Sequence, residues 1–157
     1  MISIRVYGIL LNETRQVLVS DEYIRGNYYT KFPGGGLEIG EGTRDCLRRE
    51  FKEEMNLSVE VGDHIYTTDF YQQSAFNVDH QILSIYYYVR PLEPIQVSLK
   101  TQSFDFDEQQ LAIYAERKQV ESFRFINWEY FNADALTLPI DKMAADIVKE
   151  QAAGKWH

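Results

Sequence analysis

Cysteine is almost absent from this sequence, since Cys46 is the only one among 157 residues. An internal disulfide and a cysteine-rich metal site are therefore excluded. Runs of Lys or Arg are also lacking and the formal net charge is −8, so we expect no long nucleic acid as a partner. No stretch approaches the roughly 18 apolar residues of a membrane span, and the first residues lack a signal peptide's apolar segment. We expect a cytoplasmic protein that does not bind membranes.

Apolar and aromatic residues, in contrast, are plentiful. The hydrophobic fraction is 45%, with 11 Tyr and 9 Phe. A chain of this length buries roughly 70% of its unfolded surface, which is enough for a core without covalent cross-links. The sequence shows no internal repeat and no linker. We therefore expect one domain over residues 1–157.

Runs rich in aliphatic, β-branched and aromatic residues predict the strands. These runs lie near residues 2–11, 16–20, 28–32, 58–70, 82–90 and 123–128. Asn12-Glu13-Thr14-Arg15 separates the first two and favours a hairpin loop. Pro33-Gly34-Gly35-Gly36 ends the third strand and begins a loop with special backbone geometry. Residues 100–118 are polar and less regular, and they predict no element.

Two segments predict helices. Thr43 is a candidate N-cap for a helix over residues 44–55, and Asn56 stands where a left-handed residue ends a helix. The apolar seam of this helix consists of Leu47, Phe51 and Met55. A second helix is expected from Pro139 or Ile140 to about Ala153, closed by Gly154. The pattern as a whole predicts the α+β class, with a mixed sheet between helices.

Three carboxylates stand out on the first of these helices. Glu50, Glu53 and Glu54 occupy positions i, i+3 and i+4, so they project from one face. Like charges at this spacing destabilise a helix, which favours a cation that holds them together. Carboxylate oxygens select a hard ion, Mg²⁺ by availability or Mn²⁺. The competing interpretation is a solvated acidic face, although the charges are poorly placed for Glu-to-Lys pairs four residues apart.

The surrounding residues resemble the box of the Nudix hydrolase family, whose pattern is Gly-x5-Glu-x7-Arg-Glu-U-x-Glu-Glu-x-Gly-U, where U is bulky and apolar. In this sequence Gly35 and Glu41 are followed by Arg49-Glu50-Phe51-Lys52-Glu53-Glu54-Met55-Asn56-Leu57. Asn56 replaces the final Gly, but both residues tolerate left-handed backbone angles. The resemblance implies a MutT-like α/β/α sandwich with a central mixed sheet.

The resemblance also implies roles for the matched residues. Glu50, Glu53 and Glu54 are the expected metal ligands, with the Gly35 carbonyl as a further one. The metal would activate a water that attacks phosphorus. Arg49 and Glu41 match structural positions, and a bond between them would hold the loop against the helix. A weaker interpretation makes Arg49 an exposed partner of Asp45.

A general base outside the box is often needed in the family, and its position varies. Glu121 is our candidate, placed just before the strand at 123–128, so the expected catalytic residues are Glu53, Glu50, Arg49 and Glu121. The competing acids are Glu116, Asp105, Asp107 and Glu108. Aromatic residues that could stack on a base are Tyr28, Phe32, Phe70, Tyr71 and Phe76, although core positions are the commoner role of such residues. His80 is expected at the surface or at a cap.

The expected reaction is hydrolysis of a nucleoside diphosphate linked to another moiety, such as a nucleotide sugar or ADP-ribose. Two alternatives stay open: hydrolysis of oxidised nucleoside triphosphates, and a nucleotide-sensing domain without catalysis. An isomerase on the same fold would need a cysteine in the active site, and Cys46 lies inside the box helix. The expected partner is a small phosphorylated molecule, and a homodimer is compatible with the aromatic-rich composition.

Overall fold

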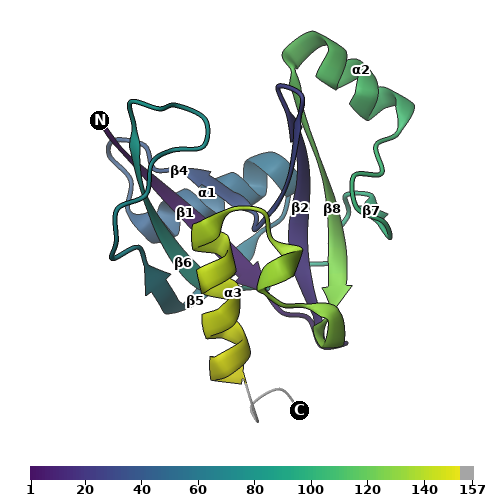
Figure 1. Cartoon of the computed structure of the whole chain (residues 1–157). Helices are drawn as coiled ribbons and strands as arrows, with labels where there is room; N and C mark the ends of the chain where they lie inside the picture. The colour runs from purple at the N-terminus through teal and green to yellow at the C-terminus, as the bar shows by residue number, and fades with distance from the viewer. Residues whose placement is uncertain (153–157) are drawn as a thin grey trace. The chain divides into compact units, whose positions relative to one another are not determined.

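The computed structural model describes residues 1–152 and shows two compact units (Figure 1). The first unit is formed by Met1–Leu10 and Pro33–Gln96, and the second by Leu11–Phe32 and the residues from Val97 onward. The expectation of one domain over residues 1–157 stays a prediction.

A mixed four-stranded sheet forms the centre of the first unit. Its strands are β1 (Ile2–Leu10), β4 (Gly34–Gly36), β5 (Val59–Thr67) and β6 (Gln81–Pro91), in the order β4-β1-β6-β5. β1 and β6 run parallel, whereas β4 and β5 pair antiparallel with their neighbours. The middle strands are rich in Ile, Val, Leu and Tyr, which suit a sheet that is covered by other elements.

Helix α1 (Thr43–Met55) packs on this sheet through the predicted seam, because Leu47, Phe51 and Met55 are all buried. Gly8 of β1 makes this approach possible, since a Cβ atom there would lie 2.7 Å from Cε2 of Phe51. Asn56 ends the helix in the left-handed conformation, with φ 49° and ψ 40°, as expected. The helix that carries the acidic cluster is therefore anchored by its apolar face.

The second unit contains the other mixed sheet. Its strands are β2 (Gln16–Ile24), β3 (Asn27–Lys31), β7 (Leu99–Lys100) and β8 (Gln119–Asn127), in the order β3-β2-β8-β7. β2 pairs antiparallel with β3 and β8, and β7 pairs parallel with β8. The predicted strands at 16–20 and 123–128 are therefore longer than expected, and Glu121 lies within β8 rather than before it.

Helices α2 (Glu108–Arg117) and α3 (Pro139–Ala152) complete the second unit, with short 3₁₀ helices at Trp128–Tyr130 and Ala133–Ala135. α3 buries Ile140, Ala144 and Val148, as its sequence pattern predicts. The amine of Lys149 donates to the Trp128 carbonyl (2.9 Å) and lies 4.2 Å from the Trp128 ring centroid. The expected ends of this helix at Ala153 and Gly154 fall outside the described residues.

The α+β class and the mixed pairing are confirmed, but the strands are divided between two sheets instead of one. The predicted hairpin loop between residues 2–11 and 16–20 is present, because Leu11 and Val17 form an antiparallel bridge and the Asn12 N–H donates to the Gln16 carbonyl (3.0 Å). Beyond this loop the two strands pair elsewhere, β1 with β4 and β6, and β2 with β3 and β8. Within 1–152, no helix is long and apolar enough to cross a membrane. The cytoplasmic location stays a prediction.

Three further local predictions need correction. The N-cap of α1 is Gly42 rather than Thr43, because the Thr43 hydroxyl contacts the Tyr87 hydroxyl (2.7 Å) and Asp45 accepts from the Gly42 N–H (3.3 Å). Gly34–Gly36 form an edge strand rather than a loop, since glycines can pair closely with β1. The irregular segment 100–118 contains β7 and α2, which bury too little apolar surface to show a periodic pattern.

Candidate active site

The loop before α1 lies unusually close to the helix. A side chain on Gly35 would clash with the carboxylate of Glu50, so only glycine lets that carboxylate lie against the loop backbone. Gly34 has a φ of +150°, and a side chain there would clash with the Val6 carbonyl of β1. Gly34 and Gly35 therefore allow the loop to pack closely against the sheet and the helix.

Arg49 ties the loop to the helix through Glu41. Its Nε donates to Glu41 Oε2 (3.0 Å) and its Nη2 to Glu41 Oε1 (2.7 Å), which is a two-pronged contact. Nη2 also donates to the Gly36 carbonyl (3.0 Å), and Glu41 Oε1 accepts from the Glu38 N–H (2.9 Å). The expected bond between Arg49 and Glu41 is present. The alternative pairing of Arg49 with Asp45 is not what the structure shows, because Asp45 pairs with Arg48 at 3.1 Å.

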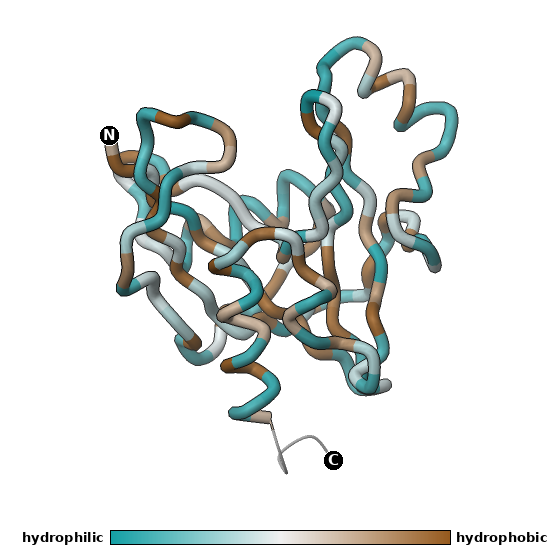
Figure 2. The backbone as a smooth tube through the Cα atoms, viewed as in Figure 1, coloured by the Kyte–Doolittle hydropathy of each residue, from teal (hydrophilic) through white to brown (hydrophobic). Residues whose placement is uncertain are grey.

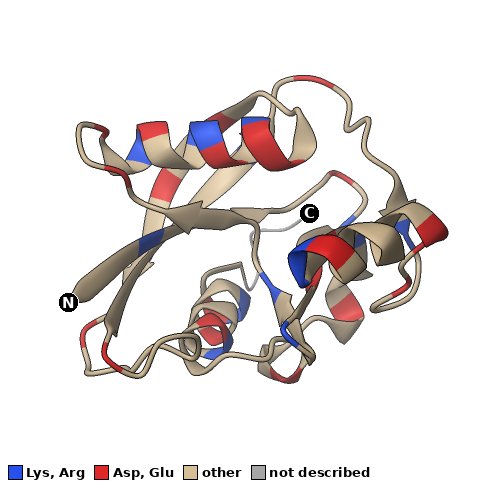
Figure 3. Cartoon of the chain, turned by 90° about the horizontal axis from the view of Figure 1, so that it is seen from above, with Lys and Arg blue, Asp and Glu red and all other residues tan. Residues whose placement is uncertain are grey.

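The other edge of the same guanidinium faces the carboxylates of the helix. Nη1 donates to Glu50 Oε1 (2.9 Å) and Glu53 Oε2 (3.2 Å), and it lies 3.6 Å from Glu38 Oε1. We call Arg49 with Glu38, Glu41, Glu50 and Glu53 the Arg49 cluster. Figure 3 shows basic and acidic residues close together along α1. The cluster holds four carboxylates and one guanidinium, so it carries excess negative charge.

Within this cluster, Arg49 and Glu41 shift each other's pKa values. Hydrogen bonds from Arg49, and next from the Glu38 backbone, lower the pKa of Glu41 to about 2. The hydrogen bond to Glu41 in turn raises the pKa of Arg49. Both groups are therefore charged over the whole physiological range of pH, and the contact between loop and helix persists across it.

Cys46 lies beneath the cluster and is fully buried. Its Sγ is 3.5 Å from the Gly36 carbonyl oxygen and 3.7 Å from Arg49 Nη2. Burial, and next the hydrogen bond to Glu41, raise the pKa of the thiol to about 12. The thiol is therefore protonated near neutral pH and suits a packing role better than a nucleophilic one.

The donor set fits a hard divalent cation. Glu50 and Glu53 offer only oxygen atoms, and both carboxylates already lie within hydrogen-bonding distance of one positive group. The Glu50 side chain is 12% exposed and that of Glu53 is 59% exposed, so the pair reaches from the loop to solvent. Within residues 1–152, no three His, Cys, Asp or Glu side chains converge as a metal-binding group, and the carboxylates gather around Arg49 instead.

Glu121, the predicted base, belongs to the second unit. It lies directly opposite Glu22 in the β2–β8 pairing, and Ser20 Oγ is within reach of both carboxylates, at 3.3 Å from Glu121 Oε2 and 3.2 Å from Glu22 Oε2. Lys31 Nζ is 3.5 Å from Glu22 Oε1. Sequence reasoning missed Glu22, Ser20 and Lys31, because only the strand register brings them beside Glu121.

The competing acids lie around α2. Asp107 is the N-cap of that helix, accepting from the Gln110 N–H (2.8 Å), and it lies 3.6 Å from Lys100 Nζ. Asp105, Glu108 and Glu116 are exposed. Asp107 therefore has a structural role as the N-cap of α2.

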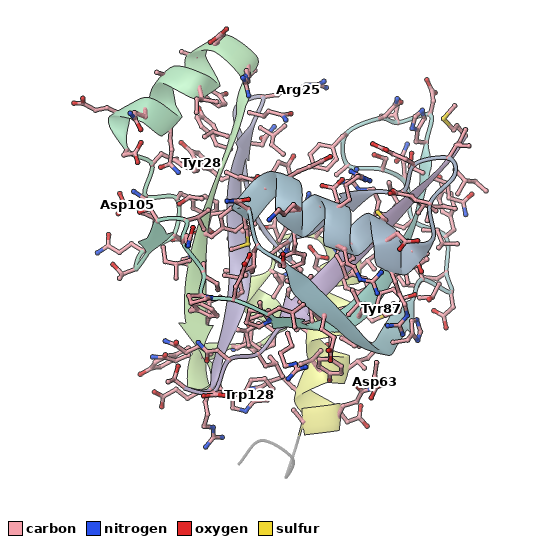
Figure 4. The ribbon with its side chains drawn as sticks, turned by 180° about the vertical axis from the view of Figure 1, so that it is seen from behind. Arg25, Tyr28, Asp63, Tyr87, Asp105 and Trp128 are labelled. Carbon is pink, nitrogen blue, oxygen red and sulfur yellow. The ribbon has the colours of Figure 1, made fainter. Side chains whose placement is uncertain are left out.

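The aromatic candidates divide between core and surface. Phe32 is buried, and Tyr28 stacks on Tyr23 with ring centroids 4.3 Å apart. Figure 4 labels Tyr28 and Arg25, which come from the same β2–β3 segment. Phe70, Tyr71 and Phe76 are exposed in the first unit. His80 lies 3.1 Å from the Ser3 hydroxyl and 3.2 Å from the Asn77 amide, as expected for a residue that holds a turn.

The family model of the NUDIX domain matches residues 1–149. The chain belongs to the NUDIX domain family. This confirms the resemblance seen in the box, and with it the expected class of enzyme, a Nudix hydrolase. The comparison with curated proteins gave no match.

Three solved structures of similar fold illustrate the likeness. The ORF135 protein of E. coli is 15% identical, with a TM-score of 0.67 over 98% of this chain and 93% of that chain. A MutT protein from Methanosarcina mazei Go1 is 16% identical, with a TM-score of 0.63 over 99% and 96%. A UDP-X diphosphatase is 12% identical, with a TM-score of 0.63 over 99% and 64%. At these identities the likeness establishes the Nudix fold alone.

Glu38 and the Gly36 carbonyl are parts of the Arg49 cluster that the sequence analysis did not assign. Glu38 lies three residues before Glu41, and its backbone N–H and carboxylate serve different partners in the cluster. The Nudix pattern leaves both positions variable. In the sequence, Glu38 could have been suspected only because it is a further acidic residue close to Glu41.

Proposed function

We propose that this Nudix chain hydrolyses the diphosphate linkage of a nucleoside diphosphate joined to another moiety, with Mg²⁺ as cofactor and Mn²⁺ as a substitute. The observation that carries the proposal is the Arg49 cluster, in which one guanidinium is surrounded by four carboxylates. A diphosphate is an anion, so an acidic site can receive it only together with a cation. In this proposal, the carboxylates that outnumber the Arg49 guanidinium bind that cation.

The proposed ligands are the carboxylates of Glu50, Glu53 and Glu54, with the Gly35 carbonyl. When bound, the ion would neutralise phosphate charge and favour attack of water on phosphorus. In the overall reaction, the oxygen of water forms a bond to one phosphorus and the P–O bond of the bridging oxygen breaks. Two phosphate products result, and the protons of the water pass to a base and to the leaving oxygen.

Arg49 and Glu41 act in this proposal as positioning residues. Glu41 and the Gly36 carbonyl fix the guanidinium, and the guanidinium holds Glu50 and Glu53 near each other before the cation arrives. This arrangement lowers the entropic cost of gathering the ligands. Glu121 is the proposed general base, because a carboxylate beside a hydroxyl and a second carboxylate can accept a proton; the choice also rests on the family resemblance.

The name of one similar structure, a UDP-X diphosphatase, supports a nucleoside diphosphate with a variable second moiety. Hydrolysis of an oxidised nucleoside triphosphate is the alternative reaction that the same test includes. The experiment is a panel of nucleotide sugars, ADP-ribose, and normal and oxidised nucleoside triphosphates, each assayed with Mg²⁺ or with EDTA. The best substrate in the presence of Mg²⁺ decides between these two reactions.

The matched variants are Glu53→Gln and Glu60→Gln. Both remove one exposed carboxylate from the first unit, but Glu60 pairs with Arg90 (2.9 Å) outside the Arg49 cluster. Glu53→Gln should lower kcat by about a hundredfold or more, and Glu60→Gln should leave it unchanged. If wild type and Glu53→Gln are equally inactive while nucleotides still raise the melting temperature, catalysis is refuted in favour of nucleotide sensing.

A further inference from the structure

Strand β2 of the second unit becomes polar while it is still buried. It changes from hydrophobic at residues 17–19 to hydrophilic at residues 20–22 (Figure 2). Ser20 is fully buried, and the Glu22 side chain is only 17% exposed. Burial of a carboxylate is costly unless an opposite charge or hydrogen bonds compensate it. Glu22 therefore needs partners within the sheet.

The strand register places Glu22 beside Glu121, because the two residues lie opposite each other in the β2–β8 pairing. Hydrogen-bonded and non-hydrogen-bonded pairs alternate along antiparallel strands. Three pairs further along, the Arg25 N–H donates to the Lys118 carbonyl (2.9 Å). Glu22 and Glu121 therefore form a non-hydrogen-bonded pair, in which Cα atoms are about 4.5 Å apart and side chains come closest. Two carboxylates in this position repel each other when both are ionised.

Ser20 and Lys31 lie on the same face of the sheet as this carboxylate pair. Ser20 is two residues before Glu22, and Lys31 is directly opposite Ser20 in the β2–β3 pairing. The Ser20 hydroxyl is 3.2 Å from Glu22 Oε2 and 3.3 Å from Glu121 Oε2, and it has one hydrogen to donate. Lys31 Nζ is 3.5 Å from Glu22 Oε1, and its side chain is 5% exposed. Glu22 thus has a cation at one oxygen and the hydroxyl at the other.

The other strong charges of the sheet lie on its opposite face. Asp21 pairs there with Arg124 at 2.6 Å, and Lys100 of β7 lies opposite Arg124 in the strand pairing. Tyr29 is opposite Glu22 and shares its face. The further titratable groups on the helices are Glu108, Glu116 and Arg117 of α2, all exposed, and the buried Asp141 of α3. Lys31 is therefore the cation that strands β2, β3 and β8 provide on the face of the carboxylate pair.

We propose that Lys31 is a positioning residue, which balances the charge of Glu22 and so keeps the neighbouring Glu121 carboxylate ionised and able to accept a proton. The inference rests on the proposed function, in which Glu121 is the general base. Without the cation, repulsion between the two carboxylates favours a proton on one of them, and a protonated Glu121 is no base. With the cation, Glu22 is compensated and the single hydrogen of Ser20 is available to orient Glu121.

The first test is the pH dependence of kcat/KM with the best substrate of wild type. Lys31→Met should move the acid limb of the profile to higher pH by about one pH unit, because loss of the cation makes the base harder to ionise. Lys31→Arg keeps the charge and should keep the limb. Lys100→Met is the matched control, since it removes a 16% exposed lysine from an ion pair with Asp107 (3.6 Å) on the other face. The control should leave the profile unchanged.

Variants of Glu22 separate charge balance from packing. Glu22→Gln removes the repelling carboxylate and leaves the cation, so the acid limb should stay at the wild-type pH or move lower. Adding Glu22→Gln to Lys31→Met should return the limb to near the wild-type pH, because both charges of the ion pair are then gone. A lysine that only fills space would not give this recovery. If Lys31→Met does not fold, Glu22→Gln decides alone, and a limb at higher pH overturns the proposal.

Carbon NMR of the glutamate carboxyl groups tests the charge balance without turnover. The Glu121 carboxyl carbon should titrate at higher pH in Lys31→Met than in wild type. If this difference is present but wild type hydrolyses none of the substrates, the charge balance stands and the proposed function is refuted. Full activity of Glu121→Gln would overturn the inference and leave hydrolysis itself intact. A Lys31→Met variant with the wild-type limb and titration, a Lys31→Arg variant as impaired as Lys31→Met, or a double variant without recovery would each overturn it as well.

Discussion

Each of the two units contains an arginine that is paired with carboxylates, but the balance of positive and negative charge differs between them. In the first unit, Arg49 serves four carboxylates, those of Glu50 and Glu53 among them. In the second unit, Arg124 pairs with one carboxylate among the described residues, that of Asp21, to which it donates through Nε (2.6 Å) and Nη2 (3.2 Å). The Asp21 side chain is 1% exposed, and it also accepts from the Thr30 hydroxyl (2.8 Å).

This difference separates a structural ion pair from the proposed metal site. Burial of a charge is costly unless an opposite charge and hydrogen bonds compensate it, and Asp21 has both. The Arg49 cluster is half open to solvent and keeps more negative than positive charge. An ion pair whose charges cancel does not attract a further cation, whereas a cluster with excess negative charge does. The following predictions test this comparison.

The largest effect is expected from Arg124→Met, which leaves the Asp21 carboxylate buried without its cation. We expect a loss of about 3–5 kcal/mol in the free energy of unfolding, measured by urea denaturation. The control is Arg90→Met, which breaks an exposed pair with Glu60 and should cost under about 1 kcal/mol. Equal losses in the two variants would show that burial does not govern these pairs.

Mg²⁺ should stabilise the protein through the other cluster. At a concentration 100 times its dissociation constant, the ion should add about 2.7 kcal/mol to the free energy of unfolding, seen as a rise in melting temperature. Glu50→Gln should reduce this gain, whereas Arg124→Met should retain it despite its lower starting stability. A wild type that is unaffected by Mg²⁺ and Mn²⁺ would contradict the proposed metal site.

Arg49→Lys should weaken metal binding without unfolding the chain. Lysine keeps the charge but cannot make the two-pronged contact with Glu41 while also reaching Glu50 and Glu53. We expect the affinity for Mn²⁺, measured by isothermal titration, to fall by about 10–100-fold, as for other residues that orient metal ligands. Unchanged affinity would show that charge alone, and not geometry, is what Arg49 contributes.

The smallest effect concerns pH. The pKa of Glu41 is about 2 in the folded chain, against 4.5 as its ordinary value. The unfolded chain therefore binds the proton more tightly, and the stability that Glu41 contributes is complete above pH 4.5 and is lost as the pH falls towards 2. Glu41→Gln should flatten this part of the stability curve in urea titrations at successive pH values. A variant with the same acid sensitivity as wild type would assign the loss to other groups.

The sequence predicted α1, its apolar seam and its C-terminal end, because these features depend on local spacing. The seam of Leu47, Phe51 and Met55 and the left-handed Asn56 follow from helical periodicity and from backbone preference. α2 was missed because it has no buried seam among its described residues, although Asp107 and Gln110 form a capping box that could have revealed its start.

Sequence alone determined the helix, the glycines and the acidic residues of the Nudix box, because each is encoded within a few neighbouring positions. Only the tertiary structure decided which strands pair, why Gly35 must be a glycine beside Glu50, and that one guanidinium joins four carboxylates. The same holds for the Asp21–Arg124 pair, whose members are more than a hundred positions apart. Pairing between distant segments depends on the packing of the whole unit, and no local pattern records it.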